Sequence, residues 1–424
     1  MITRREVLAG LGAAIAFKDD TLRVVERLVA NVRTSPKGIA EDEAFWAQIQ
    51  QAFTLDRTMV NLNNGGVCPS PRVVQDALRR MLEYSNQAPS FYMWRHLETE
   101  IDSVRRGLAK ALACDAEEVA ITRNASEALE TCLFGFDLGP GDEILTTTLD
   151  YPRMITTIQQ REKRDGIKMV QAKIPHRPTS QIEIVEAIER AITSRTKLVL
   201  VCHVIFLNGQ VLPVRRIVAM CRARGIPVIV DGAHAFAQFP FSRDDLDCEY
   251  YGTSLHKWLM APVGTGMLYV KKEKISSLWP LMAAPAESTA NVRKFEEIGT
   301  HPAANHNAIA EALAFHEMIG AERKAARLRY LRSIWTEPLL GIPSVRFHTN
   351  LAAEHSCGLT TVEISGIKTE DLANWLWEKH RIFVTAINHD QFTGIRVTPN
   401  VYTTLEEIRR FSDAMVIAAT KAIA

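Results

Sequence analysis

Short apolar runs alternate with amphipathic segments along the middle of the chain. The runs have the length and the turn-bounded character of buried strands, and the segments between them carry apolar residues at helical spacing. The strand-like runs are VAIT (Val119–Thr122), EILTT (143–147), KMVQA (168–172), KLVLVCH (197–203), PVIVDGA (227–233) and GMLYV (266–270). The helical segments are ALETCLFGF, YPRMITTIQQ, IEIVEAIERAI and VRRIVAMCRARG. This alternation predicts an α/β fold, in which a mostly parallel sheet is covered by helices on both faces to give three layers.

The pattern changes towards the C-terminus. Residues 308–334 predict long helices, which are followed by the strand-like LTTVEIS and by IRVTPNVYTTLEEIRRF. This arrangement predicts a smaller α+β domain. We therefore expect a large domain at residues 76–310, a small domain at residues 311–424, and an N-terminal segment at residues 19–75 that packs on the small domain.

Composition is that of an ordinary globular protein, with 47% hydrophobic and 23% charged residues. The formal net charge of +1 gives no reason to expect nucleic acid or an acidic membrane as a partner. The seven cysteines are scattered and include no CxxC pair, so neither a disulfide framework nor a zinc site is indicated. We expect these cysteines to be buried as small apolar thiols.

The N-terminus differs from the rest of the chain. Arg4 and Arg5 precede the short apolar run VLAGLGAAIAF, in which AIA has the small-x-small form of a cleavage site. This pattern resembles a twin-arginine export signal, and the alternative is a frayed amphipathic helix of a cytoplasmic protein. The run is too short to span a bilayer. We therefore expect a twin-arginine signal at residues 1–18 and export to the periplasm, with a cytoplasmic location as the alternative.

Three polar stretches fall where predicted strands end, and the carboxyl ends of parallel strands are where such sheets bind ligands. In the first, TRNASEALET, the strand VAIT stops, Asn124, Ala125 and Ser126 turn, and a helix begins. Free N–H groups at a helix N-terminus, beside small polar side chains, suit a phosphate group. Taken alone, the stretch is explained as simply by an ordinary helix N-cap.

The second stretch is VIVDGAHAF, in which an apolar strand ends in Asp231 and His234 follows three residues later. A buried carboxylate needs a partner, which could be a metal, an arginine or a protonated ring nitrogen. A capping aspartate is the structural alternative. No second His/Cys/Asp cluster at metal spacing accompanies the stretch, so we do not expect a metal.

The third stretch is YYGTSLHKWL, in which Lys257 stands among aromatic and apolar residues after Ser254 and His256. A desolvated lysine loses its proton easily and becomes a nucleophile toward a carbonyl, whereas a surface lysine extends its head into water. The ordered set of phosphate turn, strand-end Asp231 and Lys257 favours the first interpretation. A phosphate site, a partner for a pyridinium nitrogen and an amine for a Schiff base are what pyridoxal phosphate requires of a protein.

These stretches carry a family resemblance. The sequence resembles the class V aminotransferases of fold type I, which need pyridoxal phosphate, and within them the isopenicillin N epimerase-like branch. The resemblance runs from LNNGG at Leu62 to VYTTLEE at Val401, and it rests on SLHKWLMAPVGTGMLYV and VDGAHA, supported by TRNASEAL. It implies the fold type I architecture and a homodimer with shared active sites.

The resemblance also implies roles at the cofactor. Lys257 would form the Schiff base and act as the base at Cα, and Asp231 would keep the pyridine nitrogen protonated. His234 would lie near the ring 3-oxygen, and Tyr151 would stack on the ring. The remaining cofactor-binding residues would be Asn124, Ala125, Ser126, Ser254 and His256, with Gly299 and Thr300 reaching the phosphate of the neighbouring subunit.

For the substrate, the resemblance implies that Arg396 binds the α-carboxylate through a bidentate fork. Asn63 and Asn64 would line the substrate entrance, unless they only form a turn. Two departures stand out against cysteine desulfurases. The run His203-Val204-Ile205-Phe206 lacks the asparagine of their HxxN stretch, and EKHRIFVTAINHDQFTGIR contains no cysteine, so persulfide chemistry is not expected.

Several reactions at Cα share the same core residues. Return of the proton to the opposite face gives an epimerase, delivery to the cofactor gives an aminotransferase, and loss of a substituent gives a lyase. We expect an enzyme of the epimerase/aminotransferase type acting on an amino acid or an amino-acid-containing compound, with a C–S or C–X lyase as the alternative. A non-catalytic dimeric scaffold of the same fold is a further alternative, although Lys257, Asp231 and Arg396 are all present. The sequence does not identify the substrate.

Overall fold

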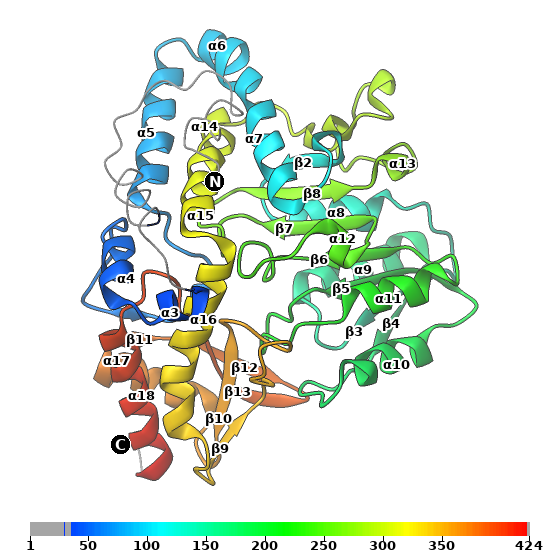
Figure 1. Cartoon of the computed structure of the whole chain (residues 1–424). Coiled ribbons are helices and arrows are strands. Elements are labelled where there is room, and N and C mark those ends of the chain that lie inside the picture. Colours follow the sequence, from blue (N-terminus) through cyan, green and yellow to red (C-terminus); the bar gives the residue numbers. More distant parts are fainter. Residues whose placement is uncertain (1–28, 30–34, 422–424) are drawn as a thin grey trace.

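Seven strands form the large sheet in the computed structural model, which describes residue 29 and residues 35–421 of the 424 (Figure 1). Their order across the sheet is β2-β8-β7-β6-β5-β3-β4. The strands are β2 (Val119–Thr122), β3 (Glu143–Thr147), β4 (Lys168–Ala172), β5 (Thr196–Cys202), β6 (Val228–Asp231), β7 (Tyr250–Ser254) and β8 (Gly266–Val270). Each apolar run that the sequence predicts to be a strand is therefore a strand of this sheet.

The sheet is mixed in direction. Strands β4, β3, β5, β6 and β7 run parallel to one another, whereas β8 runs antiparallel to both β7 and β2. The parallel strands bring their carboxyl ends to one edge, and β6 and β7 are neighbours there, with Asp231 opposite Gly252. This edge is where the three polar stretches were predicted to meet.

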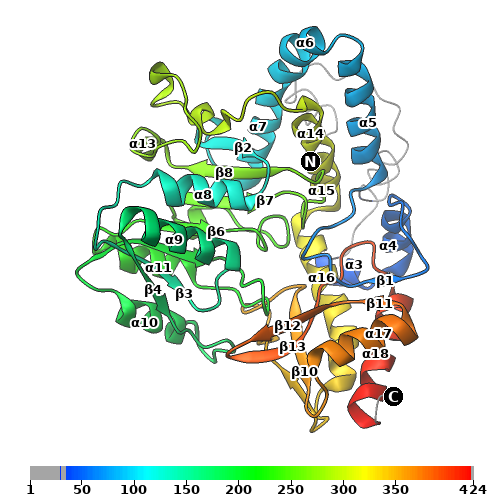
Figure 2. The same cartoon turned by 180° about the vertical axis from the view of Figure 1, so that it is seen from behind.

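Helices cover both faces of the large sheet, as the alternation of strands and helices predicts (Figures 1 and 2). Alternate side chains of β5 show how the faces are filled, because Leu198 and Leu200 pack in one core cluster while Val199 and Val201 pack in another. The first cluster includes side chains of α8 (Ala125–Gly135) and α9 (Pro152–Asp165). The helices that contribute to the second include α7 (Glu98–Leu112), α10 (Gln181–Ala191), α11 (Val214–Arg222) and α15 (Ile309–Ile319).

A second, antiparallel sheet lies towards the C-terminus and has the order β12-β13-β10-β9. Its strands are β9 (Val345–Phe347), β10 (Thr360–Ile364), β12 (Thr385–His389) and β13 (Phe392–Val397). Its helices are α16 (Ala321–Thr336), α17 (Thr369–His380) and α18 (Leu405–Thr420). Their apolar side chains share a core cluster with the strands, so this part has the predicted α+β character. The fold class predicted from the sequence is confirmed.

The long helical pattern at 308–334 is divided in two. Gly320 lies between α15 and α16 with a φ of +84°, a conformation that favours glycine, and this residue ends the first helix. The remaining helices are α3 (Pro36–Ala40), α4 (Glu43–Gln50), α5 (Arg72–Asn86), α6 (Pro89–Tyr92), α12 (Arg243–Leu246), α13 (Lys272–Ile275) and α14 (Ala303–Asn307). The short irregular helices are η1 (Met93–Leu97), η2 (Ala116–Glu118), η3 (Ala286–Ser288), η4 (Val292–Glu296) and η5 (Glu337–Leu339).

The N-terminal segment reaches the C-terminal part of the chain through a short parallel pair. Strand β1 (Val60–Asn61) pairs with β11 (Ile382–Phe383). The domain limits at 19–75, 76–310 and 311–424 stay predictions. The predicted export signal at residues 1–18 lies outside the described residues. Within the described ranges, no helix has the length and apolar character needed to cross a membrane.

Candidate active site

The turn after β7 and the turn after β6 bring Lys257 and His234 together. Lys257 Nζ lies 3.2 Å from His234 Nε2. Burial lowers the pKa of Lys257 to about 8, Asp231 opposes that shift, and Arg396 adds to it. Burial, together with the nearby charges of Lys257 and Arg396, holds the pKa of His234 well below its usual value. His234 is therefore neutral and accepts a hydrogen bond from the lysine through Nε2.

Asp231 ends β6 as a buried carboxylate. Its Oδ1 accepts a hydrogen bond from the backbone N–H of Ala233 over 2.9 Å. Burial raises the pKa of Asp231 to about 6, in opposition to that hydrogen bond and to the charge of Lys257. Within the described part of the chain Asp231 makes no ion pair, so this carboxylate fits a cationic partner supplied by a ligand, such as a protonated ring nitrogen.

The turn after β2 meets the end of β7 at the N-terminus of α8. Asn124 caps this helix by accepting from the N–H of Glu127 through Oδ1 over 2.9 Å, and Ser254 Oγ accepts from the N–H of Ala125 over 2.9 Å. Gly266 allows this close approach, because a Cβ there would lie 2.6 Å from the backbone of Asn124. A helix N-terminus flanked by hydroxyl groups, including that of the half-buried Ser126, fits a phosphate.

His256 lies in the turn after β7 and connects that turn to the N-terminal part of the chain. Its carbonyl oxygen accepts from the N–H of Cys68 over 3.0 Å. Burial lowers the pKa of His256 to about 4, so the ring is neutral. Its Nδ1 is buried without a partner among the described residues, and so is Nδ1 of His234. Such unpartnered buried nitrogens are typical of a site that binds a polar ligand.

Arg396 projects from β13 and is buried with 6% of its surface exposed. Its Nη2 donates to Asn63 Oδ1 and its Nη1 donates to the carbonyl oxygen of Phe206, each over 2.9 Å. Burial lowers its pKa to about 10, and its Nε has no partner in the part of the chain that the structure describes. Arg396 is joined through Asn63 to the loop that approaches His234, the neighbour of Lys257, so Arg396 fits the carboxylate of a ligand that reaches the lysine.

The two predicted asparagines have different surroundings. Asn63 contacts Arg396, and the loop that follows approaches the site, because a Cβ at Gly65 would lie 3.3 Å from His234 Cε1. Asn64 is completely buried, and its Nδ2 donates to the carbonyl oxygen of Thr398 over 2.8 Å. The Tyr402 hydroxyl donates to Asn64 Oδ1. These bonds use the amide of Asn64 within the protein, so Asn64 holds the loop in place.

Tyr151 and the pair Gly299-Thr300 lie at more exposed positions. Tyr151 precedes α9 and is 40% exposed, and its ring meets that of Phe206 edge to face at a centroid distance of 5.2 Å. Gly299 and Thr300 are exposed between η4 and α14. None of the contacts within the described ranges joins these residues to Lys257. The stacking of Tyr151 on the cofactor ring and the role of Gly299 and Thr300 at a neighbouring subunit therefore stay predictions.

Sequence reasoning did not single out Asp150. This residue is 5% exposed, and its Oδ1 accepts from Cys202 Sγ over 3.0 Å. Its Oδ2 accepts from the hydroxyls of Thr146 and Thr147 and from the N–H of Thr147, each over 2.7 Å. The signal that could have revealed it is the same as for Asp231, an aspartate shortly after an apolar strand.

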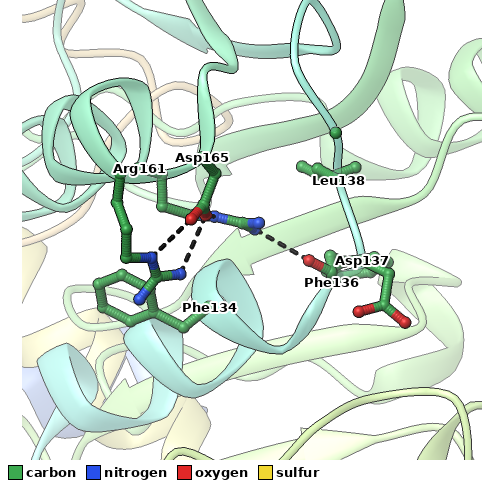
Figure 3. Close-up of a pocket in the computed structure, with 8 residues that line it drawn as sticks. Phe134, Phe136, Asp137, Leu138, Arg161 and Asp165 are labelled. Carbon is green, nitrogen blue, oxygen red and sulfur yellow. Dashed lines mark hydrogen bonds and ion pairs between the residues drawn. The ribbon is translucent and has the colours of Figure 1, made fainter.

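A cavity of about 560 Å³ lies away from these residues (Figure 3). It is lined at the C-terminal ends of α8 and α9, which lie on the amino-terminal side of the strands that follow them. Arg161 there is bound to Asp165 and donates to the carbonyl oxygens of Leu133 and Phe136, so it caps the end of α8. Because these groups serve the helix end, and parallel sheets bind ligands at the opposite edge, we assign no function to this cavity.

Known proteins resemble the chain over most of its length. It is 28% identical to isopenicillin N epimerase of Streptomyces clavuligerus over 389 residues, which cover 88% of this chain and 98% of that protein. It is 23% identical to hercynylcysteine sulfoxide lyase of Schizosaccharomyces pombe over 299 residues, 68% of this chain and 75% of that protein. A solved structure of a mutant of C-DES, with glycine covalently linked to its pyridoxal phosphate cofactor, superposes with a TM-score of 0.76 at 24% identity. It covers 86% of this chain and 99% of the other.

The cystine C–S lyase C-DES has also been solved in complex with its reaction product, cysteine persulfide. That structure superposes with a TM-score of 0.77 at 25% identity, covering 85% of this chain and 98% of the other. The family model for aminotransferase class-V matches residues 60–411, a range that begins with β1 and ends within the first half of α18. The chain therefore belongs to the aminotransferase class-V family and has its fold type I architecture and its pyridoxal phosphate cofactor, as predicted from the sequence.

Proposed function

We propose that the protein is an enzyme of the epimerase/aminotransferase type that acts at the α-carbon of an amino acid or of an amino-acid-containing compound. The observation that carries this proposal is geometric: Lys257 Nζ lies 3.2 Å from His234 Nε2, at the edge of the sheet where β6 ends in the buried Asp231. The loop that begins at Asn63, the partner of Arg396, reaches the same histidine. When bound, pyridoxal phosphate supplies an electron sink for the electron pair that remains when the Cα proton is removed.

Lys257 is suited both to hold the cofactor and to move the Cα proton. Its pKa of about 8 leaves about a fifth of the amine neutral near physiological pH, far more than for an ordinary lysine, as a nucleophile or a general base requires. The neutral His234 accepts from Lys257 Nζ over 3.2 Å and fixes where the amine points. The pair can thus take up a proton at Nζ and keep it within the site.

Asp231 and the α8 turn are suited to the two ends of the cofactor. The buried carboxylate of Asp231 would keep the ring nitrogen protonated, because the charged pair is favourable where either charge alone is costly. The backbone N–H groups at the start of α8 and the hydroxyl of Ser254 would hold the phosphate. The residues proposed at this end are Asn124, Ala125, Ser126, Ser254 and His256.

Arg396 is suited to the α-carboxylate of the substrate. A guanidinium offers a planar pair of donors that matches a carboxylate, and its Nη groups now bond to Asn63 and to the carbonyl of Phe206. A substrate carboxylate would replace one of these partners or would add a bond to the unpartnered Nε. This contact would place Cα within reach of Lys257.

A C–S or C–X lyase is the second candidate. It is favoured by the resemblance to the cystine C–S lyase C-DES and to hercynylcysteine sulfoxide lyase. A mechanism through a protein-bound persulfide is not favoured, because residues 379–395 contain no cysteine. Cys202, at the end of β5, is buried, and burial together with the charge of Asp150 raises its pKa well above the usual value, so its thiol is unreactive.

One experiment separates these reactions. The protein loaded with pyridoxal phosphate is incubated in deuterated water with a panel of amino acids, and Cα exchange, inversion, keto-acid release and elimination products are scored separately. Exchange with inversion or with keto-acid formation is the expected result. Elimination products without inversion or keto acid would establish the lyase, and a complete lack of exchange would contradict the proposal.

Two further properties belong to the proposal. The exposed Gly299-Thr300 turn supports a homodimer in which each subunit completes the phosphate site of the other, and light scattering of the loaded protein should give twice the chain mass. Export by the twin-arginine route is supported by the N-terminal sequence alone. Isolation of mature protein from the periplasm and sequencing of its N-terminus tests it, and an intact Met1 in the cytoplasm would contradict it.

A further inference from the structure

A second cavity, of about 460 Å³, opens beside the candidate active site. Three segments that are far apart in the sequence form it: the chain from Thr148 into α9, the turn at Phe206 after β5, and strand β12. Figure 2 shows β12 and β13 extending from the small sheet towards the large one. The volume lies within the range of about 300–1,000 Å³ that is typical of small-molecule sites.

Phe206 connects this cavity to the residues proposed for the substrate and the cofactor. Phe206 lines the cavity, and its ring meets the ring of Tyr151 at a centroid distance of 5.2 Å. Its carbonyl oxygen accepts from Arg396 Nη1 over 2.9 Å. Phe206 is therefore the one residue between the cavity and Arg396, the proposed site of the α-carboxylate. A substrate held at Arg396, with its Cα at Lys257, has one group left to place, which is its side chain.

The walls of the cavity are mainly apolar. Pro152 and Ile155 of α9 form one side, Phe206 and Leu207 form another, and Ile387 of β12 closes the third. Apolar walls of this kind stabilise a ligand by about 25 cal/mol per Å² of apolar surface that is removed from water. A side chain as small as that of cysteine or alanine would leave most of this space unfilled.

The charged and polar groups of the lining are already bound within the protein. His389 donates through Nε2 to the carbonyl oxygen of Thr148 over 2.9 Å, and its Nδ1 accepts from the N–H of Gln391 over 3.2 Å. Asn388 donates through Nδ2 to Glu370. With both ring nitrogens in use, His389 has no free donor or acceptor for a ligand, and its bond to Thr148 fixes β12 against the opposite wall.

Asp150 is the acidic group among the lining residues, and it is likewise engaged. Its two carboxylate oxygens accept from Cys202, Thr146 and Thr147, and burial raises its pKa. It is therefore not placed to pair with an ammonium group on a ligand. A charged side chain that entered the cavity would lie against its apolar walls and find no partner of opposite charge, which is unfavourable.

We propose that this cavity binds the side chain of the amino-acid substrate and selects bulky, uncharged and mainly apolar side chains. The inference rests on the proposed function, because it takes Arg396 as the carboxylate site and Lys257 as the base. It goes further by naming the class of substrate and the residues that select it, chiefly Ile155, Phe206 and Ile387.

The first test compares substrates on the loaded enzyme through Cα exchange in deuterated water. Leucine, methionine and phenylalanine should exceed aspartate, lysine and alanine by about 10-fold or more in kcat/KM, the scale that a hydrophobic pocket gives. Ile155→Trp, which fills the cavity, should lower kcat/KM for leucine by about 10-fold while leaving alanine within about two-fold. The matched control is Ile182→Trp on the exposed face of α10, which should change neither.

The second test measures binding without turnover. Reduced conjugates of the cofactor with leucine and with alanine are added to the cofactor-free protein, and the shift of the thermal midpoint is recorded. The leucine conjugate should give the larger shift in the wild type, and the difference should vanish in Ile155→Trp. Equal shifts in the wild type, or equal losses for both conjugates in the variant, would overturn the side-chain assignment and leave the proposed function standing. Failure of both conjugates to bind would overturn the proposed function, and the side-chain assignment with it.

Discussion

Lys257 Nζ lies 3.2 Å from Nε2 of His234, and the two residues come from turns that follow neighbouring parallel strands. The histidine is buried and neutral, so it acts as a hydrogen-bond acceptor for the lysine and does not compete with it as a cation. This contact gives the amine a fixed direction within a site in which burial already favours its neutral form.

Replacement of His234 tests that contact. His234→Leu removes the acceptor, and because a hydrogen bond to a charged group contributes about 1.5–3 kcal/mol, Cα exchange should fall by about 10-fold or more. His234→Gln retains an acceptor oxygen and should keep more of the activity. Exchange rates in deuterated water measure both. Equal activity of the leucine variant and the wild type would show that the contact has no role.

Asp231 should make the cofactor-free protein sensitive to pH. Its pKa is about 6 in the folded chain against a usual value of 3.8, so between about pH 4 and 6 the folded state binds more protons than the unfolded state. The free energy of unfolding therefore falls as the pH rises through this window, by about 3 kcal/mol in all. Asp231→Asn cannot ionise, so it should unfold at a higher temperature than the wild type above pH 6, with the gap shrinking as the pH falls.

Asp245→Asn is the control for this experiment, because the pKa of Asp245 is shifted in the opposite direction to that of Asp231. Hydrogen bonds from Ser242 lower the pKa of Asp245, so its charge stabilises the folded state above the usual carboxyl pKa. Asp245→Asn should therefore lower the thermal midpoint at neutral pH. A wild type and an Asp231→Asn variant with the same midpoint at every pH would contradict the buried charge that we assign to Asp231.

The pH dependence of cofactor attachment follows from Lys257. Only the neutral amine attacks the cofactor aldehyde, and burial places the pKa of this amine at about 8. The initial rate of covalent attachment to the cofactor-free protein should rise with pH, with a midpoint near 8. Absorbance in the visible range measures this rate. A midpoint near 10.5, the usual lysine value, would show that the amine is not desolvated.

Arg396→Lys should separate substrate binding from cofactor binding. A lysine cannot reproduce the planar pair of donors, so KM for amino acids should rise by about 10-fold or more. Attachment of the cofactor to Lys257 should be unchanged. Arg346→Lys, at an exposed position of β9, is the matched control and should leave KM unaltered. A normal KM in Arg396→Lys would show that the substrate carboxylate binds elsewhere.

The sequence predicts the strands, and singles out the candidate site residues, for a common reason. An apolar run that ends in Asp231, or that leads into the turn with Lys257, indicates both a strand and the edge of the sheet at which the polar side chain lies. The roles of Asn64 and Gly320 could not be foreseen in this way. Whether an asparagine faces a cleft or a carbonyl such as that of Thr398 depends on contacts between distant segments.

The same limit applies to the second cavity. Its walls come from Ile155, Phe206 and Ile387, which belong to three separate segments, and no local pattern marks any of them. The division of residues 308–334 into two helices depends on one positive φ at Gly320, which a hydrophobic period does not reveal. Local patterns therefore determine the elements, and the packing between elements determines the shape of the site.

Reductive trapping identifies the lysine that carries the cofactor, which we propose to be Lys257. The loaded protein is treated with borohydride, digested, and mapped by mass spectrometry, with Lys324 as an internal comparison because burial lowers its pKa to about 7 as well. We expect one pyridoxyl label, on the peptide that contains Lys257, and none in Lys257→Ala. A label on the peptide of Lys324, or a label that persists in Lys257→Ala, would contradict this assignment.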